Sequence, residues 1–233
     1  MAAFRPVGTR GMSEETLVAG DCELVSGVVA TNTTVGNATL PATSLISGSI
    51  YRSGPTGAYT DTLDSAANIY LALAGNGNAP AIASGLGFTC RITNATAYVE
   101  TITLGTGHAQ GQGTIATIAA NSWRDFLFTF TAVQAPLTVI GNTTTGSNAI
   151  TWTLPVGQAS LQEGVAPNSV NIAVGSTVNC TGFAAGTTVL GVTQGVGGTL
   201  GIICSANATS TNSNVAVGIG PTITVNSSGS GSV

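Results

Sequence analysis

The sequence predicts a mainly β protein with one short helix, followed by a smaller C-terminal β module. Three observations support this fold class. Short runs rich in Val, Ile and Thr alternate in hydrophobicity and are separated by Gly, Asn and Ser. The segment RDFLFTFTAV (124–133) places its three phenylalanines on one face with period two, as a core strand does. Only the segment at about 62–74 has the apolar spacing of a helix.

Composition divides the chain of 233 residues into four regions. Residues 1–20 show little periodicity, so we expect an N-terminal arm that becomes ordered on a partner or a neighbouring subunit. The first and larger β domain is expected over 21–141. Aromatic residues become rare after about 142, and Gly-rich turns between short strands predict the second module over 142–225. The stretch NSSGSGSV (226–233) predicts a flexible tail.

The segment YTDTLDSAANIYLAL, residues 59–73, carries the helix signal. Asp61 is predicted to be the N-cap, because its carboxylate can accept hydrogen bonds from the first turn. Asp64 lies three residues later, at the reciprocal capping-box position. These roles suffice for both carboxylates, so we do not interpret them as a catalytic acid/base pair. Arg52 has no such explanation, and we expect it to pair with Asp61, Asp64 or a neighbouring subunit.

Charge is scarce in this chain. Charged residues make up 6% of the sequence and there is no lysine, against about 25% charged residues in an ordinary soluble domain. A nucleic-acid binder needs a basic surface, and a membrane-surface helix needs basic residues beside an apolar face. Neither pattern is present, so we expect no nucleic-acid or membrane partner. The beginning of the chain lacks the apolar region of a signal peptide. A neutral polar surface favours a protein that is packed into an assembly.

No grouping of residues in the sequence indicates catalysis, a metal or a cofactor. The cysteines lack zinc-finger spacing and are expected to be free, half-buried thiols, with a Cys180–Cys204 bridge as the alternative. His108 lies in a Gly-rich segment and is expected in a surface loop, without a G-x-S-x-G nucleophile motif to join it. Trp123 and Trp152 are interpreted as core-packing residues rather than as a sugar-binding platform. The cysteines are Cys22, Cys90, Cys180 and Cys204.

Several short motifs together resemble a family of small virion structural proteins from tailed bacteriophages. RSGPTGAYTDT (52–62) is similar to the family pattern R-x-G-P-T-x-x-x-T-D-T. FTCRITNATA (88–97), TLGTG (103–107) and IAANSWR (118–124) are similar to the strands and the turn that follow it. The resemblance covers about residues 45–140, and each motif is weak by itself. VGSTVNCTGFAAGTTVLGVTQG and the following LGIICSANAT also resemble β modules of phage virion proteins, although Cys204–Ser205 stands where Leu–Ser is usual.

The resemblance implies that the domain over 21–141 is a jelly-roll-like antiparallel β-sandwich. It also implies oligomers that are often trimers, and a place on the virion. We therefore expect a non-enzymatic capsid decoration (cement) protein, made in the bacterial cytoplasm, that binds the major capsid protein on the capsid exterior as a homotrimer. The alternative is a fibre, spike or tail-associated protein that binds a host receptor. Arg5, Arg10 and Arg52 are the candidate intersubunit or capsid contacts. The family supplies no catalytic residues.

Overall fold

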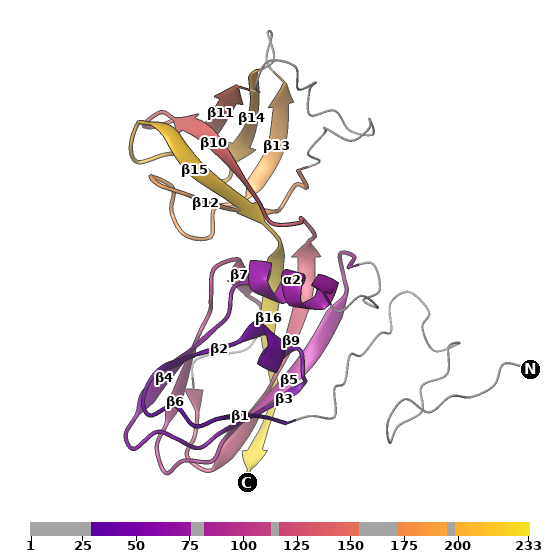
Figure 1. Ribbon diagram of the computed structural model, residues 1–233, viewed down its shortest axis with the longest axis vertical. Coiled ribbons are helices and arrows are strands. Elements are labelled where there is room, and N and C mark those ends of the chain that lie inside the picture. The colour runs from indigo at the N-terminus through magenta and orange to yellow at the C-terminus, as the bar shows by residue number, and fades with distance from the viewer. Residues whose placement is uncertain (1–28, 76–81, 113–116, 154–171, 195–198) are drawn as a thin grey trace, which may run out of the picture.

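The computed structural model describes residues 29–75, 82–112, 117–153, 172–194 and 199–233. These residues form two lobes, which we call the base (residues 29–133 and 222–233) and the barrel (residues 137–220) (Figure 1). The strands and helices of the base are β1 (Ala30–Asn32), β2 (Ala38–Leu40), α1 (Ala42–Leu45), β3 (Ser49–Arg52), β4 (Tyr59–Leu63), α2 (Ala66–Gly75), β5 (Gly87–Asn94), β6 (Glu100–Thr103), β7 (His108–Gln110), β8 (Thr117–Ile118), β9 (Ser122–Ala132) and β16 (Thr222–Ser232). The strands of the barrel are β10 (Leu137–Thr143), β11 (Ala149–Thr153), β12 (Thr177–Cys180), β13 (Val189–Gln194), β14 (Thr199–Cys204) and β15 (Asn212–Gly220).

The base is a sandwich of two sheets, with strand orders β1-β3-β5-β9-β16-β7 and β2-β4-β6-β8. The chain alternates between them, so that β1, β3 and β5 lie parallel in one sheet and β2, β4 and β6 lie parallel in the other. The predicted mainly β fold with packed sheets is confirmed. The predicted antiparallel jelly-roll pairing is wrong for these six strands, because α1 and α2 carry the chain back to the first sheet and each new strand pair stacks in parallel on the last.

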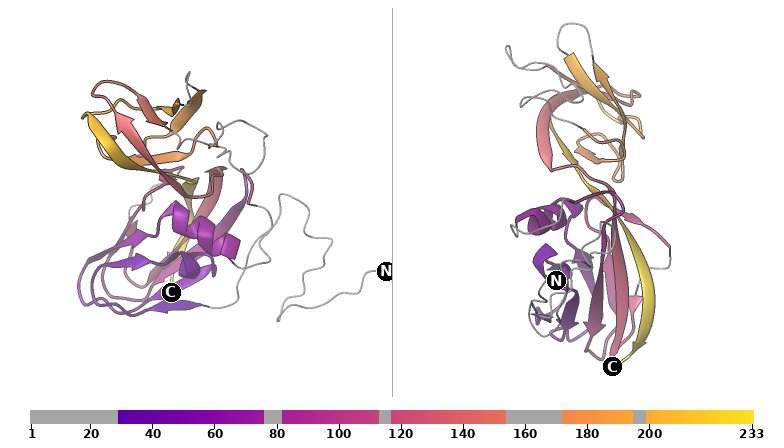
Figure 2. Two further views of the ribbon diagram at one scale, coloured as in Figure 1. Left: turned by 45° about the horizontal axis from the view of Figure 1, so that its top comes forward. Right: turned by 90° about the vertical axis from the view of Figure 1, so that its right-hand side faces the viewer.

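The core of the base lies between the two sheets and beneath α2. Phe126, Phe128 and Phe130 point into it and are fully buried, as their period-two spacing predicted. Phe128 stacks on Phe88 with ring centroids 4.8 Å apart. Helix α2 adds Ile69 to the same cluster. The side view in Figure 2 shows β16 on one side of the base and the helices on the other.

Helix α2 begins later than the sequence predicted, at Ala66 instead of about residue 62. Its N-cap is Ser65, whose hydroxyl accepts a hydrogen bond from the Asn68 backbone N–H at 3.1 Å. The residues before it form β4, which ends at Leu63 and pairs in parallel with β6. A second helix, α1, begins after Pro41 and packs against α2.

The stretch predicted to be a flexible tail is the end of strand β16. This strand pairs antiparallel with β9 from Thr222 to Ser232 and parallel with β7 on its other side. Ile223 and Val225 face the core and are fully buried. The composition of NSSGSGSV misled the prediction, because the last residues of β16 are small for a packing reason. A Cβ at Gly231 would lie 2.8 Å from the Trp123 ring, so glycine lets the indole lie against this strand.

The barrel is an antiparallel unit with its own core, and it is inserted in the chain between β9 and β16. Its strand order is β12-β15-β10-β11-β14-β13. The edges meet through a Thr177–Thr188 bridge and through hydrogen bonds such as Val189 N–H to the Ser176 carbonyl at 2.8 Å. Trp152 is buried inside. The predicted second module is thus present, but it begins at β10 and ends before β16 rather than spanning 142–225.

Gly54 allows the β3–β4 loop to pass directly over the β1–β2 loop. A Cβ at this position would lie 2.0 Å from the Thr33 carbonyl oxygen, which is backbone and cannot rotate away. We expect Gly54→Ala to destabilise the protein by at least about 2 kcal/mol in urea unfolding. Gly57→Ala, in the same loop with nothing within 4 Å of the added Cβ, is the matched control and should change stability by less than about 0.5 kcal/mol. Equal effects would contradict the close approach.

Candidate functional site

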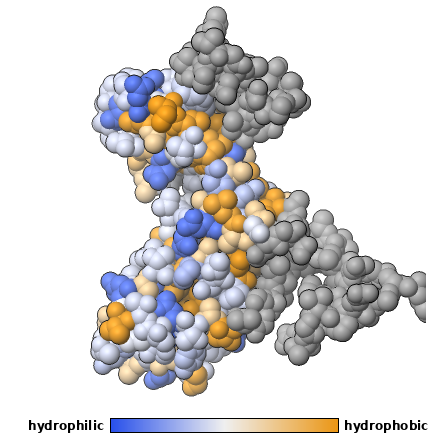
Figure 3. All heavy atoms as spheres, viewed as in Figure 1, coloured by the Kyte–Doolittle hydropathy of each residue, from blue (hydrophilic) through white to orange (hydrophobic). Residues whose placement is uncertain are grey.

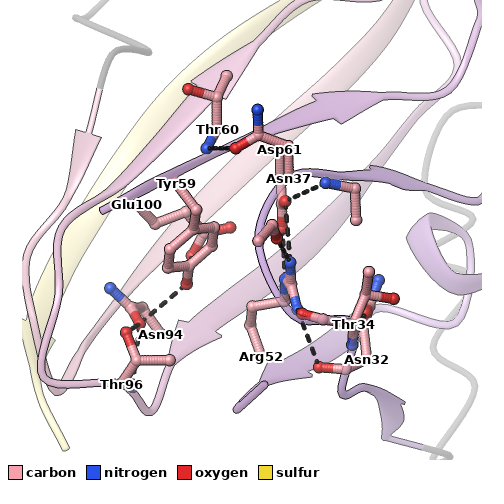
Figure 4. A network of polar contacts seen from close by, with 12 residues as sticks. Asn32, Thr34, Asn37, Arg52, Tyr59, Thr60, Asp61, Asn94, Thr96 and Glu100 are labelled. Atoms are coloured by element: carbon pink, nitrogen blue, oxygen red, sulfur yellow. Dashed lines mark hydrogen bonds and ion pairs between the residues drawn. The ribbon is translucent and has the colours of Figure 1, made fainter. Parts of the chain in front are cut away.

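A cluster of charged and polar side chains is buried where the strands of the base meet the loops that connect its two sheets (Figure 4). Arg52 ends β3 and Asp61 lies in the middle of β4, and both side chains are fully buried. Arg52 Nε donates to Asp61 Oδ2 at 2.6 Å, and Nη2 donates to Asp61 Oδ1 at 3.2 Å. Of the three expected partners of Arg52, which were Asp61, Asp64 and a neighbouring subunit, the structure shows Asp61.

The remaining donors of Arg52 hold the β1–β2 loop. Nη1 donates to the carbonyls of Asn32 and Thr34, and Nη2 donates to the carbonyl of Gly36. The guanidinium also lies over the Tyr59 ring, 4.9 Å from its centroid. Because Arg52 is enclosed in this way, its predicted role as an intersubunit or capsid contact is wrong.

Asp61 does not cap a helix, so the predicted N-cap role is wrong. Its side chain points inward from β4, where Oδ1 also accepts from the Ala38 backbone N–H at 2.9 Å. Asp64 is not the capping-box residue of α2, because it lies just before the Ser65 cap. It accepts hydrogen bonds from the Ser65 N–H at 2.8 Å and from the N–H of Ala42, the first residue of α1, at 3.0 Å. Asp64 therefore ties the starts of the two helices together.

Glu100, Tyr59 and Asn94 form the other half of the cluster. The Tyr59 hydroxyl lies 3.0 Å from Asn94 Oδ1 and 3.1 Å from Glu100 Oε2. Asn94 Nδ2 donates to three backbone carbonyls, one of them that of Tyr98 at 2.7 Å. Its Oδ1 accepts from the backbone N–H and the hydroxyl of Thr96. Asn94 thus organises the β5–β6 loop, as Arg52 organises the β1–β2 loop.

Burial controls the acidity of this half of the cluster. Glu100 is fully buried. Burial, followed by the neighbouring charge of Asp61, raises its pKa to about 8. Burial and the nearby Glu100 also raise the pKa of Tyr59. The Glu100 carboxyl is therefore largely protonated at neutral pH, which leaves the buried group with one cation, Arg52, and one anion, Asp61.

His108 lies in β7 with its ring against the core, so its predicted place in a surface loop is wrong. The ring lies edge-on to Phe128, 6.1 Å between centroids. Both ring nitrogens are shielded from water and have no hydrogen-bond partner among the described residues. Burial lowers the pKa of His108 to about 4. The imidazole is thus held neutral as a packing group.

We expect His108→Leu to leave stability at pH 7 unchanged or to raise it by up to about 1 kcal/mol, because it removes unpaired buried polar atoms. In the wild type, the folded-state pKa lies below the ordinary value of 6.5. The stability that the wild type gains by keeping the His108 imidazole neutral in the folded state is therefore complete above pH 6.5. It is lost as the pH falls towards 4. Urea unfolding between pH 4 and 7 should show a shallower acid loss in the variant. An unchanged acid loss would contradict this interpretation.

The exposed face of the base carries an ion pair stacked on an indole. Arg91 donates to both carboxylate oxygens of Asp125, at 2.8 and 2.9 Å. Its guanidinium lies 3.8 Å from the Trp123 ring centroid. The Arg91 side chain is 48% exposed. Trp123 is held between Arg91 and the glycines of β16 on this outer face and is only partly buried. The predicted core position is therefore wrong for Trp123, whereas it is confirmed for Trp152 in the barrel.

The other candidates can be placed briefly. Cys90, Cys180 and Cys204 are free thiols, as expected, but they are buried rather than half-buried, and the alternative Cys180–Cys204 bridge is not formed. Arg5, Arg10 and Cys22 lie outside the described residues. Over the described part of the chain, no group of three or more His, Cys, Asp or Glu side chains could hold a metal ion. No helix in that part is long and apolar enough to cross a membrane.

A scan against protein-family models and searches of curated proteins and of solved structures found no match to this chain.

The members of the cluster that sequence reasoning missed are Tyr59, Asn94 and Glu100. A signal for two of them was present in the strand pattern. Tyr59 and Asp61 alternate with outward residues in β4 and so share the inward face with Leu63. Glu100 likewise shares the inward face of β6 with Ile102. An acid at an inward position of an alternating strand indicates a buried partner.

Proposed function

We propose that this chain is a non-enzymatic virion structural protein of a tailed bacteriophage, a capsid decoration protein that binds the major-capsid lattice as a homotrimer. The observation that carries the proposal is that several charged side chains of the base are used inside the fold, which leaves few charges on the surface. Arg52, Asp61 and Glu100 are fully buried and bind other parts of the same chain. Arg52 and Asp61 lie in the motif 52–62 of the resemblance, and Glu100 lies between two of the other motifs. In the structure these residues stabilise the stacked strands and their loops.

The surface left by this arrangement is mainly neutral. The described residues of the barrel include no Asp, Glu, Lys or Arg. Figure 3 shows both lobes covered largely by side chains of intermediate hydropathy, with separate hydrophobic spots. Ile140 and Leu190 on the barrel and Val35 and Val99 on the base are among the exposed apolar residues. Such a surface favours broad, uncharged protein–protein contacts, which bury area without desolvating ions.

The test is a binding experiment with the full chain. Native mass spectrometry should detect trimers, and the protein should co-sediment with expanded capsids assembled from the major capsid protein of the same genome. Unexpanded procapsids are the control for a lattice-specific contact. A stable monomer that fails to co-sediment with expanded capsids would overturn the proposal.

The alternative, a fibre, spike or tail protein that binds a host receptor, is favoured by one observation. The barrel has a core of its own and lies as a separate lobe beyond the base. It could therefore present its loops while the base is anchored. Binding of the full chain to host cell-surface glycans on an array, together with no binding to capsids, would favour this alternative.

A further inference from the structure

The buried cluster contains two carboxyl groups, Asp61 and Glu100, but one cation, Arg52. Isolated buried charge is costly, so the number of ions that this site can hold depends on the partners available to each carboxyl. The contacts of each group show which of the two can be ionised.

The guanidinium has no hydrogen left for Glu100. Arg52 carries five N–H groups. Two are directed to Asp61, and the others are directed to the carbonyls of Asn32, Thr34 and Gly36. Asp61 also accepts from the Ala38 N–H. The Asp61 carboxylate is therefore hydrogen-bonded at both oxygens. Arg52, the cation that could otherwise compensate a negative charge on Glu100, is already bound to Asp61.

The surroundings of Glu100 suit a neutral acid. Its Oε1 is buried and has no partner among the described residues. Its Oε2 lies 3.1 Å from the Tyr59 hydroxyl, whose single hydrogen can instead go to Asn94 Oδ1 at 3.0 Å. Asn94 Oδ1 is fixed as an acceptor, because Nδ2 donates to three carbonyls. The Glu100 carboxyl also lies within hydrogen-bonding reach of the Asp61 carboxylate. A protonated Glu100 can therefore donate to Asp61 or to Tyr59, while Tyr59 donates to Asn94.

We propose that protonation of Glu100 keeps the β1–β2 and β5–β6 loops of the base ordered. Both loops become less ordered when the buried carboxyl releases its proton to solvent. The released proton leaves a second buried carboxylate beside Asp61, and the two anions then compete for Arg52. The β1–β2 loop is held by Arg52, and the β5–β6 loop is held by Asn94 and Thr96. Both loops are therefore expected to lose order together. The proposal does not depend on the virion role.

The titratable groups that face Glu100 are few. Strand β3 contributes Arg52, and β4 contributes Tyr59 and Asp61. From β5 and β8, the neighbouring residues are the uncharged Asn94 and Ile118. The sign follows from the ordinary value of 4.5 and the folded-state pKa of about 8. The folded chain keeps a proton that the unfolded chain releases, so stability falls as the pH rises through this range. Titration of His108 makes stability rise with pH, but only below pH 6.5. Between pH 6.5 and 8 the effect of Glu100 can therefore be measured without that of His108.

The experiment compares wild type with Glu100→Gln, which keeps the shape of the side chain and cannot ionise. Between pH 6.5 and 8, the folding equilibrium constant of the wild type should fall by up to about tenfold per pH unit, and that of the variant should stay level. Amide hydrogen exchange in residues 33–37 and 95–99, corrected for the intrinsic pH effect, should accelerate in the wild type alone. Asp125→Asn, which removes an exposed carboxylate of the base, is the control and should keep the wild-type slope.

A direct readout on the wild type keeps the proposal falsifiable even if Glu100→Gln does not fold. Infrared spectra in D₂O at pH 6.5 should contain the carbonyl band of one protonated carboxylic acid, which disappears as the pH is raised past about 8. The band should survive in Asp125→Asn. If the wild type has no such band at pH 6.5, or if its stability is level across the window, the proposal is overturned.

Discussion

Arg52→Ala is expected to remove about 3–5 kcal/mol of folding free energy, because it leaves the Asp61 carboxylate buried without a counter-ion. The same change leaves the carbonyls of Asn32, Thr34 and Gly36 without their donor. Since domains are stable by about 5–15 kcal/mol, a large part of the population should be unfolded at modest denaturant concentrations. Urea unfolding followed by circular dichroism measures the loss.

Arg91→Ala is the matched control, because it removes the same side chain from the exposed ion pair of the same lobe. Asp125 remains in contact with water after the change, so the cost should be about 1 kcal/mol or less, including the lost stacking on Trp123. If Arg52→Ala cost no more than Arg91→Ala, the buried ion pair would not be holding the loops of the base.

Ending the chain after Pro221 is expected to unfold the base, with a loss of more than about 4 kcal/mol. The deleted strand β16 contributes the fully buried Ile223 and Val225, and burying each of these side chains is worth about 2 kcal/mol. Its removal also leaves β9 without a partner along one whole edge. The two tryptophans report on the lobes separately, since Trp123 lies in the base and Trp152 in the barrel core.

Two point variants in β16 separate the effect of its inward side chains from that of chain length. Ile223→Ala should cost about 2–5 kcal/mol. Thr224→Ala, at the next position and on the outward face, should cost less than about 0.5 kcal/mol. A truncated chain that unfolds like the wild type would show that β16 is dispensable, as a flexible tail would be.

Local patterns of the sequence predicted the parts of the fold that depend on neighbouring residues. The Phe126–Phe130 alternation identified a core strand, and the thinning of aromatic residues near 142 indicated a second β unit. Parallel stacking was not predictable in this way, because the paired residues lie at unequal distances along the chain. Ala30 pairs with Ile50, and Ile50 pairs with Ile92, so the lengths of the intervening loops and helices hide any repeat.

The candidate site was predicted only in part for a similar reason. The sequence indicated that Arg52 needs an acidic partner and named Asp61 among the choices. The capping roles given to Asp61 and Asp64 were plausible locally and were overridden by tertiary structure, since β4 pairs with β2 and β6 over the residues assigned to the helix start. Glu100 carried no nearby charge in the sequence to suggest that it would share their site.

The insertion of the barrel between β9 and β16 has a consequence for synthesis on the ribosome. All six barrel strands emerge before β16 does, so the barrel can fold while the sheet of the base still has a gap between β9 and β7. Domains fold as units during translation, and unpaired strand edges promote aggregation. The edge of β9 in the nascent base therefore stays unpaired until β16 has been synthesised. Slowing translation within the barrel would prolong this vulnerable interval.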